Sequence, residues 1–330
     1  MARRSRKDKR VAYPIVVIPN HLPHLNFLEE WDELKATELI IIQDIGDKIP
    51  LPKGFKGTIY DHKDIKDDLG NNSWIIPTQS SACRSYGYYK AWQAGATHIY
   101  TLDNDCYPDG SNFLLGHIEN LESNTTLDWV TSTHQFPFTR GFPYEIRNTS
   151  PVGVSHGLWS NVPDLDAATS LHNPNLRFSG LYKTEVITIP RHNFYPMCGM
   201  NLAWRAELTP IMYFGIFGPD WDFDQYDDIW AGVLSKKICD HLGYAHVSGY
   251  PSVEHRKQSN VYANLKKQAP GLQMNENFWK VVQGIQLKST EIVASYRELI
   301  EQLPEVIEGE PVGYTKHFKR ASLLWINLFE

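Results

Sequence analysis

The stretch THIYTLDNDCYP, Thr97–Pro108, joins a run of strand-forming residues to an acidic triplet and decides how the first half of the chain is interpreted. The apolar run Thr97–Leu102 is typical of a strand buried in an α/β protein. The carboxylates of Asp103 and Asp105 follow where that strand would end. Parallel sheets bind ligands at the carboxyl ends of their strands, so the stretch predicts both a fold class and the edge that carries the site.

Strand-like and helix-like segments alternate on either side of this stretch. Strands are predicted at 12–20, where Pro19 is expected to stop the strand, and at 36–44, 58–62 and 97–102. Helices are predicted at 25–34 and at 80–96, the second with a serine at its start and Gly95 at its end. This alternation predicts an α/β domain with a mostly parallel sheet flanked by helices.

The second half of the chain changes in character. Residues 134–200 are rich in Pro, Gly, Asn and aromatic residues and are predicted to form long loops, with a strand at 183–190 as the exception. A helix is expected at 226–243 and a strand at 244–249. We divide the chain into a basic flexible tail (1–12), a catalytic domain (13–275) and a C-terminal helical extension (276–330) that packs on the body or on a partner.

Composition excludes several classes of protein. The 330 residues are 42% hydrophobic with a net charge of −6, which argues against a general affinity for nucleic acid. Residues 1–10 carry six basic side chains and one acid, typical of a solvated tail or of weak attraction to anionic lipid or RNA. No apolar run is long enough to span a bilayer, so we expect a cytoplasmic protein, with peripheral membrane contact left open. The cysteines are widely separated and are expected to be buried thiols: Cys83, Cys106, Cys198 and Cys239.

Two carboxylates two residues apart can bind one divalent cation, because the chain leaves regular pairing there and can curl around the ion. Oxygen ligands of this kind suit Mg²⁺ or Mn²⁺ holding a diphosphate. Asp103 and Asp105 are favoured because they end a strongly apolar strand; the alternative is that they cap a turn. The same spacing recurs at Asp164/Asp166, Asp220/Asp222 and Asp222/Asp224.

Other candidates each have a plain structural explanation beside a functional one. His255 follows a predicted strand and is either a packed residue or a metal ligand. Asp227 and Asp228 open the helix at 226–243, where acids are favoured by the helix dipole, but they could also serve as a general base. Arg140 and Arg147 lie in an aromatic loop, where they either stack on rings or bind phosphate oxygens.

Two further features could bind phosphate or sugar. Arg84, in the helix before the acidic strand, could also bind phosphate. Segments 155–167 and 194–205 combine Gly, Trp and Tyr with small polar groups, a mixture common both in sugar-binding loops and in ordinary turns.

Ten segments together resemble one known family in order along the chain. They are VVIPNHLPHLNFLEEW, IIIQD, SSACRSYGY, LDNDCY, RGFPYEIR, SHGLWSNVPDLDA, FYPMCGMNLAW, YDDIWAG, KKICDHLG and SNVYANLKK. On these segments the chain closely resembles the reversibly glycosylated polypeptides, the UDP-arabinopyranose mutase family (glycosyltransferase family 75). The resemblance runs from Tyr13 to the C-terminus and is weakest in the last fifty residues.

The resemblance implies a glycosyltransferase-A type fold, a D-x-D motif that binds Mn²⁺ or Mg²⁺, and interconversion of UDP-arabinopyranose and UDP-arabinofuranose. It also implies a UDP-pentose substrate and homo- or hetero-oligomers. Arg140 corresponds to the arginine that becomes reversibly glycosylated, and Arg147 to a second arginine that the family uses. The expected site residues are Pro19, Asp44, Arg84, Asp103 and Asn104 for the nucleotide, Asp103, Asp105 and His255 for the metal, and Arg140, Arg147, Asp227 and Asp228 for catalysis.

Two departures from the family pattern keep other functions open. Asn104 replaces the middle acid of three consecutive acids, and Asn148-Thr149 follow Arg147 where the family has Glu-Gly. One alternative is a transferase of the same fold that passes a sugar from a UDP-sugar to a separate acceptor. Another is a non-catalytic subunit that binds UDP-sugar and recruits an active partner.

Overall fold

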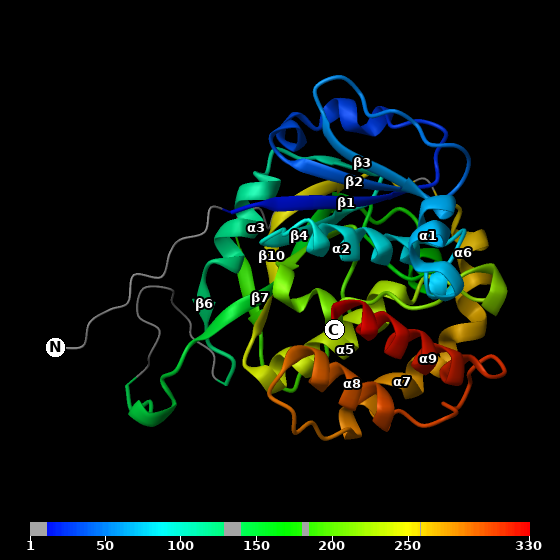
Figure 1. The fold of residues 1–330 in the computed structure, drawn as a ribbon. Helices are drawn as coiled ribbons and strands as arrows, with labels where there is room; N and C mark the ends of the chain where they lie inside the picture. Colours follow the sequence, from blue (N-terminus) through cyan, green and yellow to red (C-terminus); the bar gives the residue numbers. More distant parts are fainter. Residues whose placement is uncertain (1–11, 129–139, 180–184, 258) are drawn as a thin grey trace.

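The computed structural model describes residues 12–128, 140–179, 185–257 and 259–330 (Figure 1). The predicted tail 1–12 lies outside these residues except for Ala12. An eight-stranded path runs through the molecule in the order β3-β2-β1-β4-β9-β7-β10-β5. Its strands are β1 (Pro14–Asn20), β2 (Glu38–Gln43), β3 (Lys56–Asp61), β4 (His98–Leu102), β5 (Cys106–Pro108), β7 (Ser150–Asn161), β9 (Asn201–Arg205) and β10 (Ala245–His255).

Most neighbours in this sheet run parallel. Strands β3, β2, β1 and β4 are parallel to one another, as are β7 and β10, whereas β9 is antiparallel to β4 and β7, and β5 to β10. Short strands β6 (Asn124–Thr125) and β8 (Val186–Ile189) pair with β7 and β10. The predicted α/β class with a mostly parallel sheet is confirmed.

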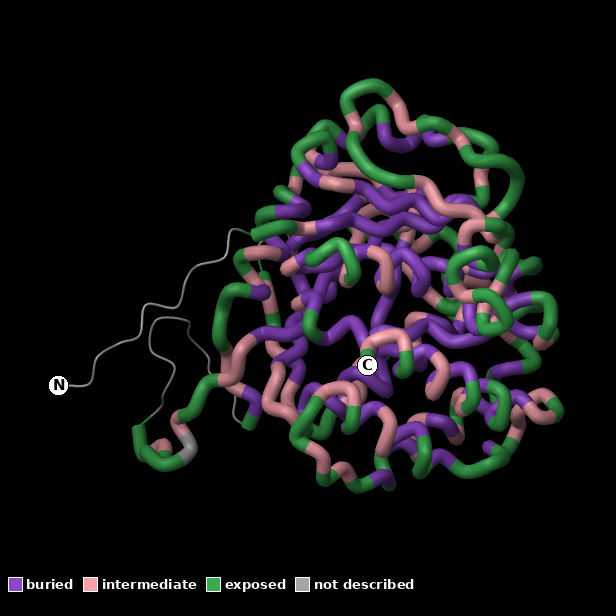
Figure 2. The backbone as a smooth tube through the Cα atoms, viewed as in Figure 1, coloured by how far each residue is buried: buried purple, intermediate pink, exposed green. Residues whose placement is uncertain are grey.

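Alternate residues of the central strands point to two hydrophobic cores. In β1, Val16 and Ile18 belong to one buried cluster, while Ile15 and Val17 belong to the other. The same alternation holds in β2. Successive side chains of a strand point to opposite faces, so strands apolar at every position need cover on both sides. Figure 2 shows the buried backbone running through the sheet, with exposed chain around it.

Helices supply this cover on both faces of the sheet (Figure 1). Helix α2 and the C-terminal helices join one core, and α3 with two 3-10 turns, Asn26–Glu30 and Asp32–Ala36, joins the other. The α-helices are α1 (His62–Leu69), α2 (Arg84–Gln93), α3 (Phe113–Leu121), α4 (Ala167–His172), α5 (Asp227–Leu242), α6 (Val261–Gln268), α7 (Leu272–Gly284), α8 (Ile292–Gln302) and α9 (Tyr314–Ile326).

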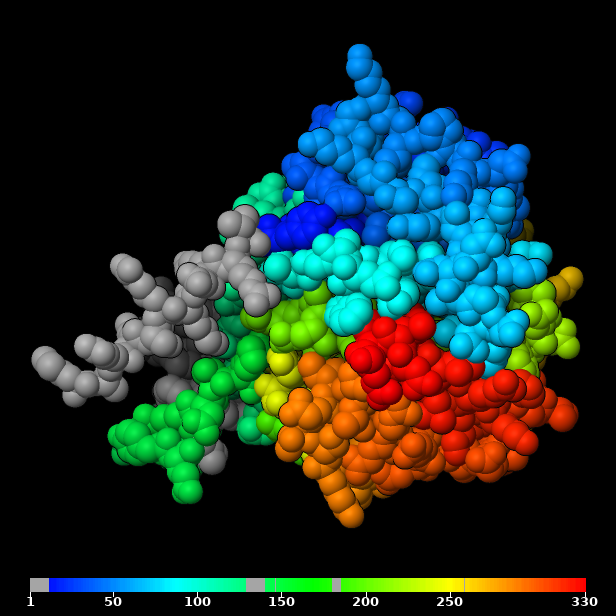
Figure 3. Space-filling model, in the orientation of Figure 1, coloured from blue at the N-terminus to red at the C-terminus, as the bar shows by residue number. Residues whose placement is uncertain are grey.

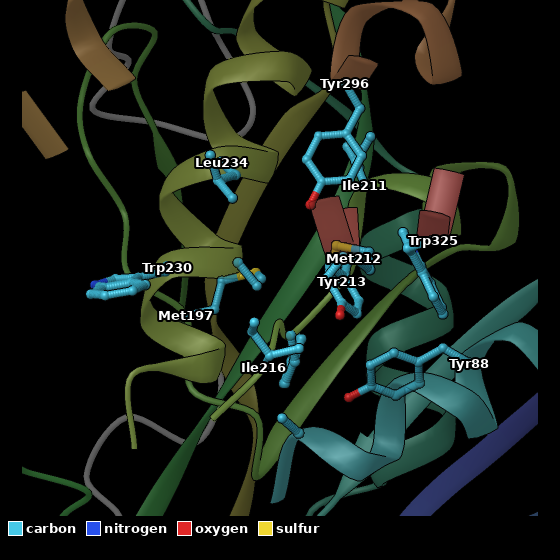
Figure 4. Packing of buried hydrophobic residues seen from close by; sticks show 14 of the residues in the cluster. Tyr88, Met197, Ile211, Met212, Tyr213, Ile216, Trp230, Leu234, Tyr296 and Trp325 are labelled. Atoms are coloured by element: carbon cyan, nitrogen blue, oxygen red, sulfur yellow. The ribbon is translucent and has the colours of Figure 1, made fainter. Parts of the chain in front are cut away.

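The C-terminal helices pack directly on the rest of the chain through aromatic side chains. Trp325 of α9 stacks on Tyr213 with ring centroids 5.1 Å apart, and its indole N–H donates to the Pro210 carbonyl. Trp230 of α5 stacks on Phe278 of α7 at 4.5 Å. Figure 4 shows side chains from α2, α5, α8 and α9 converging in this cluster. Helices α7 to α9 therefore share one core with the sheet.

Three local predictions need correction. Strand β1 is not stopped by Pro19 but continues to Asn20. The pairing of β1 with β4 ends at Val17, so the missing N–H of Pro19 removes no hydrogen bond between these two strands. The helix predicted at 25–34 is instead the pair of 3-10 turns. The loop predicted for 134–200 contains the twelve-residue strand β7, because pairing with β9 and β10 outweighs the weak strand propensity of its Gly, Ser and Asn residues.

The predicted buried thiols are confirmed, since all four cysteines are free and buried. Burial raises the pKa of each thiol above its ordinary value. Within the described residues, no helix combines the length and apolar character needed to cross a membrane.

Candidate functional site

A cavity of about 300 Å³ opens at the carboxyl ends of β1, β2 and β4. The sheet order explains this placement, because these parallel neighbours end at the same edge. Polar side chains after each strand therefore meet there. The lining contains every residue expected to bind the nucleotide, namely Pro19, Asp44, Arg84, Asp103 and Asn104. It also contains Asp105, which together with Asp103 was expected to bind the metal.

Arg84 fixes the first carboxylate of the motif from below the cavity. Its Nη2 lies 2.5 Å from Oδ1 of Asp103, while the guanidinium also donates to the carbonyls of Ser81 and Gly199 and to the Thr101 hydroxyl. Burial raises the pKa of the Asp103 carboxyl, against the lowering effect of the arginine. Gly199 permits this contact, since a β-carbon there would lie 2.9 Å from Nη1. Arg84 thus holds Asp103 at the cavity wall.

Asn104, the middle residue of the triplet, lines the cavity and is also hydrogen-bonded within the protein. It is buried, and its amide donates to Oδ1 of Asn20 at 2.9 Å; Asn20 in turn donates to Gln43 at 2.9 Å. These bonds tie the ends of β1, β2 and β4 together. The middle position of the triplet therefore joins a hydrogen-bond network between strands in addition to lining the cavity with the outer positions.

Asp105 and His255 come together from distant parts of the chain. Strand β5 pairs antiparallel with β10, which brings His255 Nε2 to 3.5 Å from Oδ2 of Asp105. The other ring nitrogen lies 2.8 Å from the Val162 carbonyl. Burial opposes protonation of His255, but the hydrogen bond and charge of Asp105 raise its pKa overall. The structure thus brings the predicted metal ligands Asp103, Asp105 and His255 to one region.

Asp44 lies at the end of β2, as predicted, and is held in place by two contacts. Its Oδ1 accepts the backbone N–H of Gln79 at 2.9 Å and lies 2.7 Å from Nε2 of His62. Gln79 has a φ of +54°, a left-handed conformation that costs free energy in a non-glycine residue and is common at ligand sites.

The first turn of α5 contributes two carboxylates, of which Asp227 is buried and Asp228 is half-buried. Asp227 accepts a hydrogen bond from Ser81 at 2.7 Å, and Asp228 accepts the N–H of Gly199 at 2.8 Å. Burial and the charge of Asp224 raise the pKa of Asp227 to about 6. Burial and the charges of Asp227 and Asp164 raise the pKa of Asp228 well above its ordinary value. Both carboxyl groups are therefore easier to protonate than an ordinary aspartate.

A second group of ligand atoms was missed as a unit from sequence. Atoms of Asp164, Cys198 and Asp228 lie within 4.8 Å of one another, and the Cys198 thiol donates to Asp164 at 2.7 Å. The charge of Asp164 also raises the pKa of Asp103, so this group faces the same region as the D-x-D motif. In the sequence, Asp164 stands out only for its D-x-D spacing and its Trp-containing segment, and a lone cysteine does not indicate a site.

These donors fit a divalent cation at the site. Carboxylate oxygens crowd the region, and the buried arginine beneath them offsets only part of their charge. Hard oxygen donors with an imidazole are ligands that Mn²⁺ accepts, and the carboxylates alone suit Mg²⁺.

Arg140 and Arg147 lie at the opposite end of β7 from this site. Asn161, the last residue of β7, pairs with His255, whereas Arg147 lies just before the first, Ser150. The two ends of this 12-residue strand are roughly 36 Å apart at about 3.3 Å per residue. Arg147 stacks on Tyr144 at 3.8 Å and donates to the Phe142 carbonyl at 2.7 Å. In Figure 3 the green segment 140–149 projects beyond the body. The structure does not bring the two arginines to the carboxylates.

The fold and the cavity define an α/β protein with a carboxylate-lined cavity at the carboxyl edge of its parallel strands. The chain belongs to the reversibly glycosylated polypeptide family, whose model matches residues 12–330. It is 37% identical to UDP-arabinopyranose mutase 1 of Arabidopsis thaliana, over 96% of this chain and 91% of the relative. It is 36% identical to UDP-arabinopyranose mutase 1 of Oryza sativa subsp. japonica, over 96% and 90%. It is 38% identical to a protein of Pisum sativum named probable UDP-arabinopyranose mutase 1, over 96% and 90%.

Proposed function

We propose that this protein interconverts UDP-arabinopyranose and UDP-arabinofuranose. The observation that carries the proposal is the match along almost the whole chain to proteins named UDP-arabinopyranose mutase. The cavity beside Asp103 and Asp105 supports it, because its lining offers groups for a nucleotide and for a metal. We place the reaction in the cytoplasm, where the basic tail could meet an anionic membrane surface.

The nucleotide end of the site uses residues that the sheet positions. Asp44, locked by Gln79 and His62, accepts hydrogen bonds from the ribose or the uracil. Asp103 and Asp105, with His255, would hold Mn²⁺ or Mg²⁺, which when bound would neutralise charge that develops on the diphosphate as the anomeric C–O bond breaks. Arg84 keeps Asp103 in position throughout.

The sugar end of the site uses the carboxylates at the start of α5. Closing the ring at a different hydroxyl requires that this hydroxyl lose a proton and the former ring oxygen gain one. Asp227 and Asp228 are suited to exchange such protons because burial favours their neutral forms. UDP then recaptures the anomeric carbon in the new ring form.

We propose that the arginines take part through a second copy of the chain. Arg147 is three residues from Ser150, so its backbone stays within about 11 Å of the far end of β7. We propose that the segment 140–149 of one copy reaches the cavity of another, where Arg140 carries the sugar reversibly and Arg147 assists it. A guanidinium must first lose a proton to act as a nucleophile, and Asp227 or Asp228 would accept it.

The separation of the arginines also favours one rival function. A transferase that passes the sugar to a separate acceptor would need neither arginine at the cavity. The two functions differ in their products, because a transferase releases UDP in proportion to the glycosylated acceptor, whereas a mutase retains the nucleotide sugar.

The test is to incubate the purified chain with UDP-arabinopyranose and Mn²⁺ and to separate the sugar nucleotides by chromatography. The proposal expects UDP-arabinofuranose to appear without an added acceptor. Free UDP without a furanose product would support the transferase. Folded protein that binds UDP-arabinopyranose and converts none of it would support the non-catalytic subunit.

A further inference from the structure

The cavity holds an excess of acidic side chains over cationic ones. Its permanently cationic lining residues are Arg84 and Lys267, and its acidic lining residues are Asp44, Asp103, Asp105 and Asp224. A nucleoside diphosphate adds further negative charge. One divalent cation at Asp103 and Asp105 offsets only part of this total, so the diphosphate needs a cationic side chain as well.

Arg84 cannot supply this contact. Its side chain is 3% exposed, and its Nε, Nη1 and Nη2 atoms all have protein partners. Turning it toward a ligand would leave Asp103 and the Gly199 carbonyl without their buried partner. Among the lining residues, only Lys267 therefore remains as a permanent cation that can reach a ligand.

Lys267 has a fixed backbone and a loosely held ammonium group. Its carbonyl accepts the N–H of Asp224 at 3.1 Å, and Gln225 bonds to Asn264 one turn earlier in α6 at 3.2 Å. The side chain is 52% exposed, with Nζ 3.9 Å from Oδ2 of Asp224, beyond hydrogen-bond distance. The strong partners of Asp224 are instead Ser80 and the N–H of Gln225, both 2.9 Å from Oδ1.

We propose that Lys267 is a positioning residue that binds a phosphate of the nucleoside diphosphate, and that Asp224 is its partner when the cavity is empty. The proposal rests on the nucleotide site of the proposed function. The backbone of α6 places the side chain at the rim, and its weak ion pair lets the ammonium group turn to the ligand at little cost. The competing role for Lys267 is a hydrogen bond to an oxygen of the base.

The experiment compares UDP with uridine, which has the same base and ribose but no phosphate. Affinities are measured in Mn²⁺, by calorimetry for UDP and by ligand-observed NMR for uridine. For Lys267→Met we expect a UDP affinity about tenfold lower or weaker still, since a hydrogen bond to a charged group contributes about 1.5–3 kcal/mol. Uridine affinity should not change, and Lys267→Arg should restore most of the UDP affinity.

Lys266→Met is the matched control, because Lys266 is the exposed neighbour in the same helix and does not line this cavity. It should bind UDP like the wild type. Unchanged UDP affinity in Lys267→Met, or an equal loss for UDP and uridine, would overturn the proposal. A wild-type chain that binds UDP but isomerises nothing would refute the mutase function, and the UDP affinity of Lys267→Met would still decide the role of Lys267. A wild-type chain that binds neither ligand would overturn both.

Discussion

Arg84, at the start of α2, and Asp103, directly after β4, form an ion pair of 2.5 Å beneath the cavity. The arginine is buried and the carboxylate is partly exposed, so one partner supports the other from inside the protein. The charge at this edge of the sheet is therefore set in part by a residue that a ligand does not need to touch.

Removing the guanidinium should destabilise the fold measurably. Arg84→Gln leaves Asp103 without its cation, and breaking a buried pair in this way typically costs about 3 kcal/mol. Denaturant unfolding at pH 7 checks the value, with Asp103→Asn and the double variant completing a cycle. We expect Arg84→Gln to cost less free energy when Asp103 is already Asn. Equal costs in both backgrounds would show that the pair is not coupled.

The hydrogen bonds that hold the Asn104 amide within the protein predict that this residue does not set metal affinity. Asn104→Asp would place a carboxylate against Oδ1 of Asn20 and force that amide to turn, with a loss of about 1–2 kcal/mol of stability. Mn²⁺ affinity, measured by titration calorimetry in the presence of UDP, should stay within about threefold of the wild type. A gain of tenfold or more would mean that position 104 faces the ion.

The remote arginines predict complementation between two inactive chains. Arg140→Ala lacks the arginine but keeps the cavity, while Asp105→Asn keeps the arginine but lacks a proposed metal ligand. If the segment 140–149 works on a second copy, unfolding the two variants together and refolding them as a mixture should restore a substantial fraction of the wild-type rate.

Each variant refolded alone serves as the control and should stay inactive. A mixture with no more activity than the sum of its components would show that the arginine acts within its own chain or not at all. Full activity of Arg140→Ala alone would remove this arginine from the mechanism.

Because two histidines are buried in neutral form, we expect acid to destabilise the protein already at pH values well above those at which ordinary carboxyl groups titrate. Burial lowers the pKa of His117 to about 3, although its hydrogen bond with Asn201 acts in the opposite direction, and lowers that of His156 to about 4. The unfolded chain takes up these protons near pH 6.5, before the folded one does. Stability is therefore complete above pH 6.5 and falls below it, by about 1.4 kcal/mol per pH unit for each histidine.

The free energy of unfolding between pH 6.5 and 4.5 tests this point. His117→Gln should reduce the slope by about one proton, since glutamine does not titrate. His24→Gln, at an exposed position, should leave the slope unchanged. Equal slopes in the wild type and His117→Gln would contradict the assignment.

Much of the sheet could be predicted from sequence because β1, β2 and β4 are continuous apolar runs with polar residues after them. That pattern also located Asp44, Asp103 and Asp105, since parallel strands end at a common edge. Strand β7 could not be predicted, because its Gly- and Ser-containing sequence becomes a strand only between β9 and β10.

The assembly of the site depends on contacts that local sequence does not encode. The pairing of β5 with β10 brings His255 to Asp105, and the packing of α5 on the sheet brings Asp228 to Cys198 and Asp164. Likewise, nothing local to RGFPYEIR shows that a long strand separates it from the cavity. Sequence identified most of the residue types, whereas topology decided which of them meet.

The most direct test of the central claim is the rate of UDP-arabinofuranose formation from UDP-arabinopyranose by the wild type, Asp105→Asn and Asp220→Asn. Asp220 shares the D-x-D spacing but is exposed, which makes it the matched control. We predict furanose product from the wild type and from Asp220→Asn with Mn²⁺. For Asp105→Asn we predict a rate at least about tenfold lower, because even mutations of residues that only support metal ligands lower activity by about tenfold or more. Folded wild-type protein that forms no furanose, or Asp105→Asn as active as the wild type, would contradict the account.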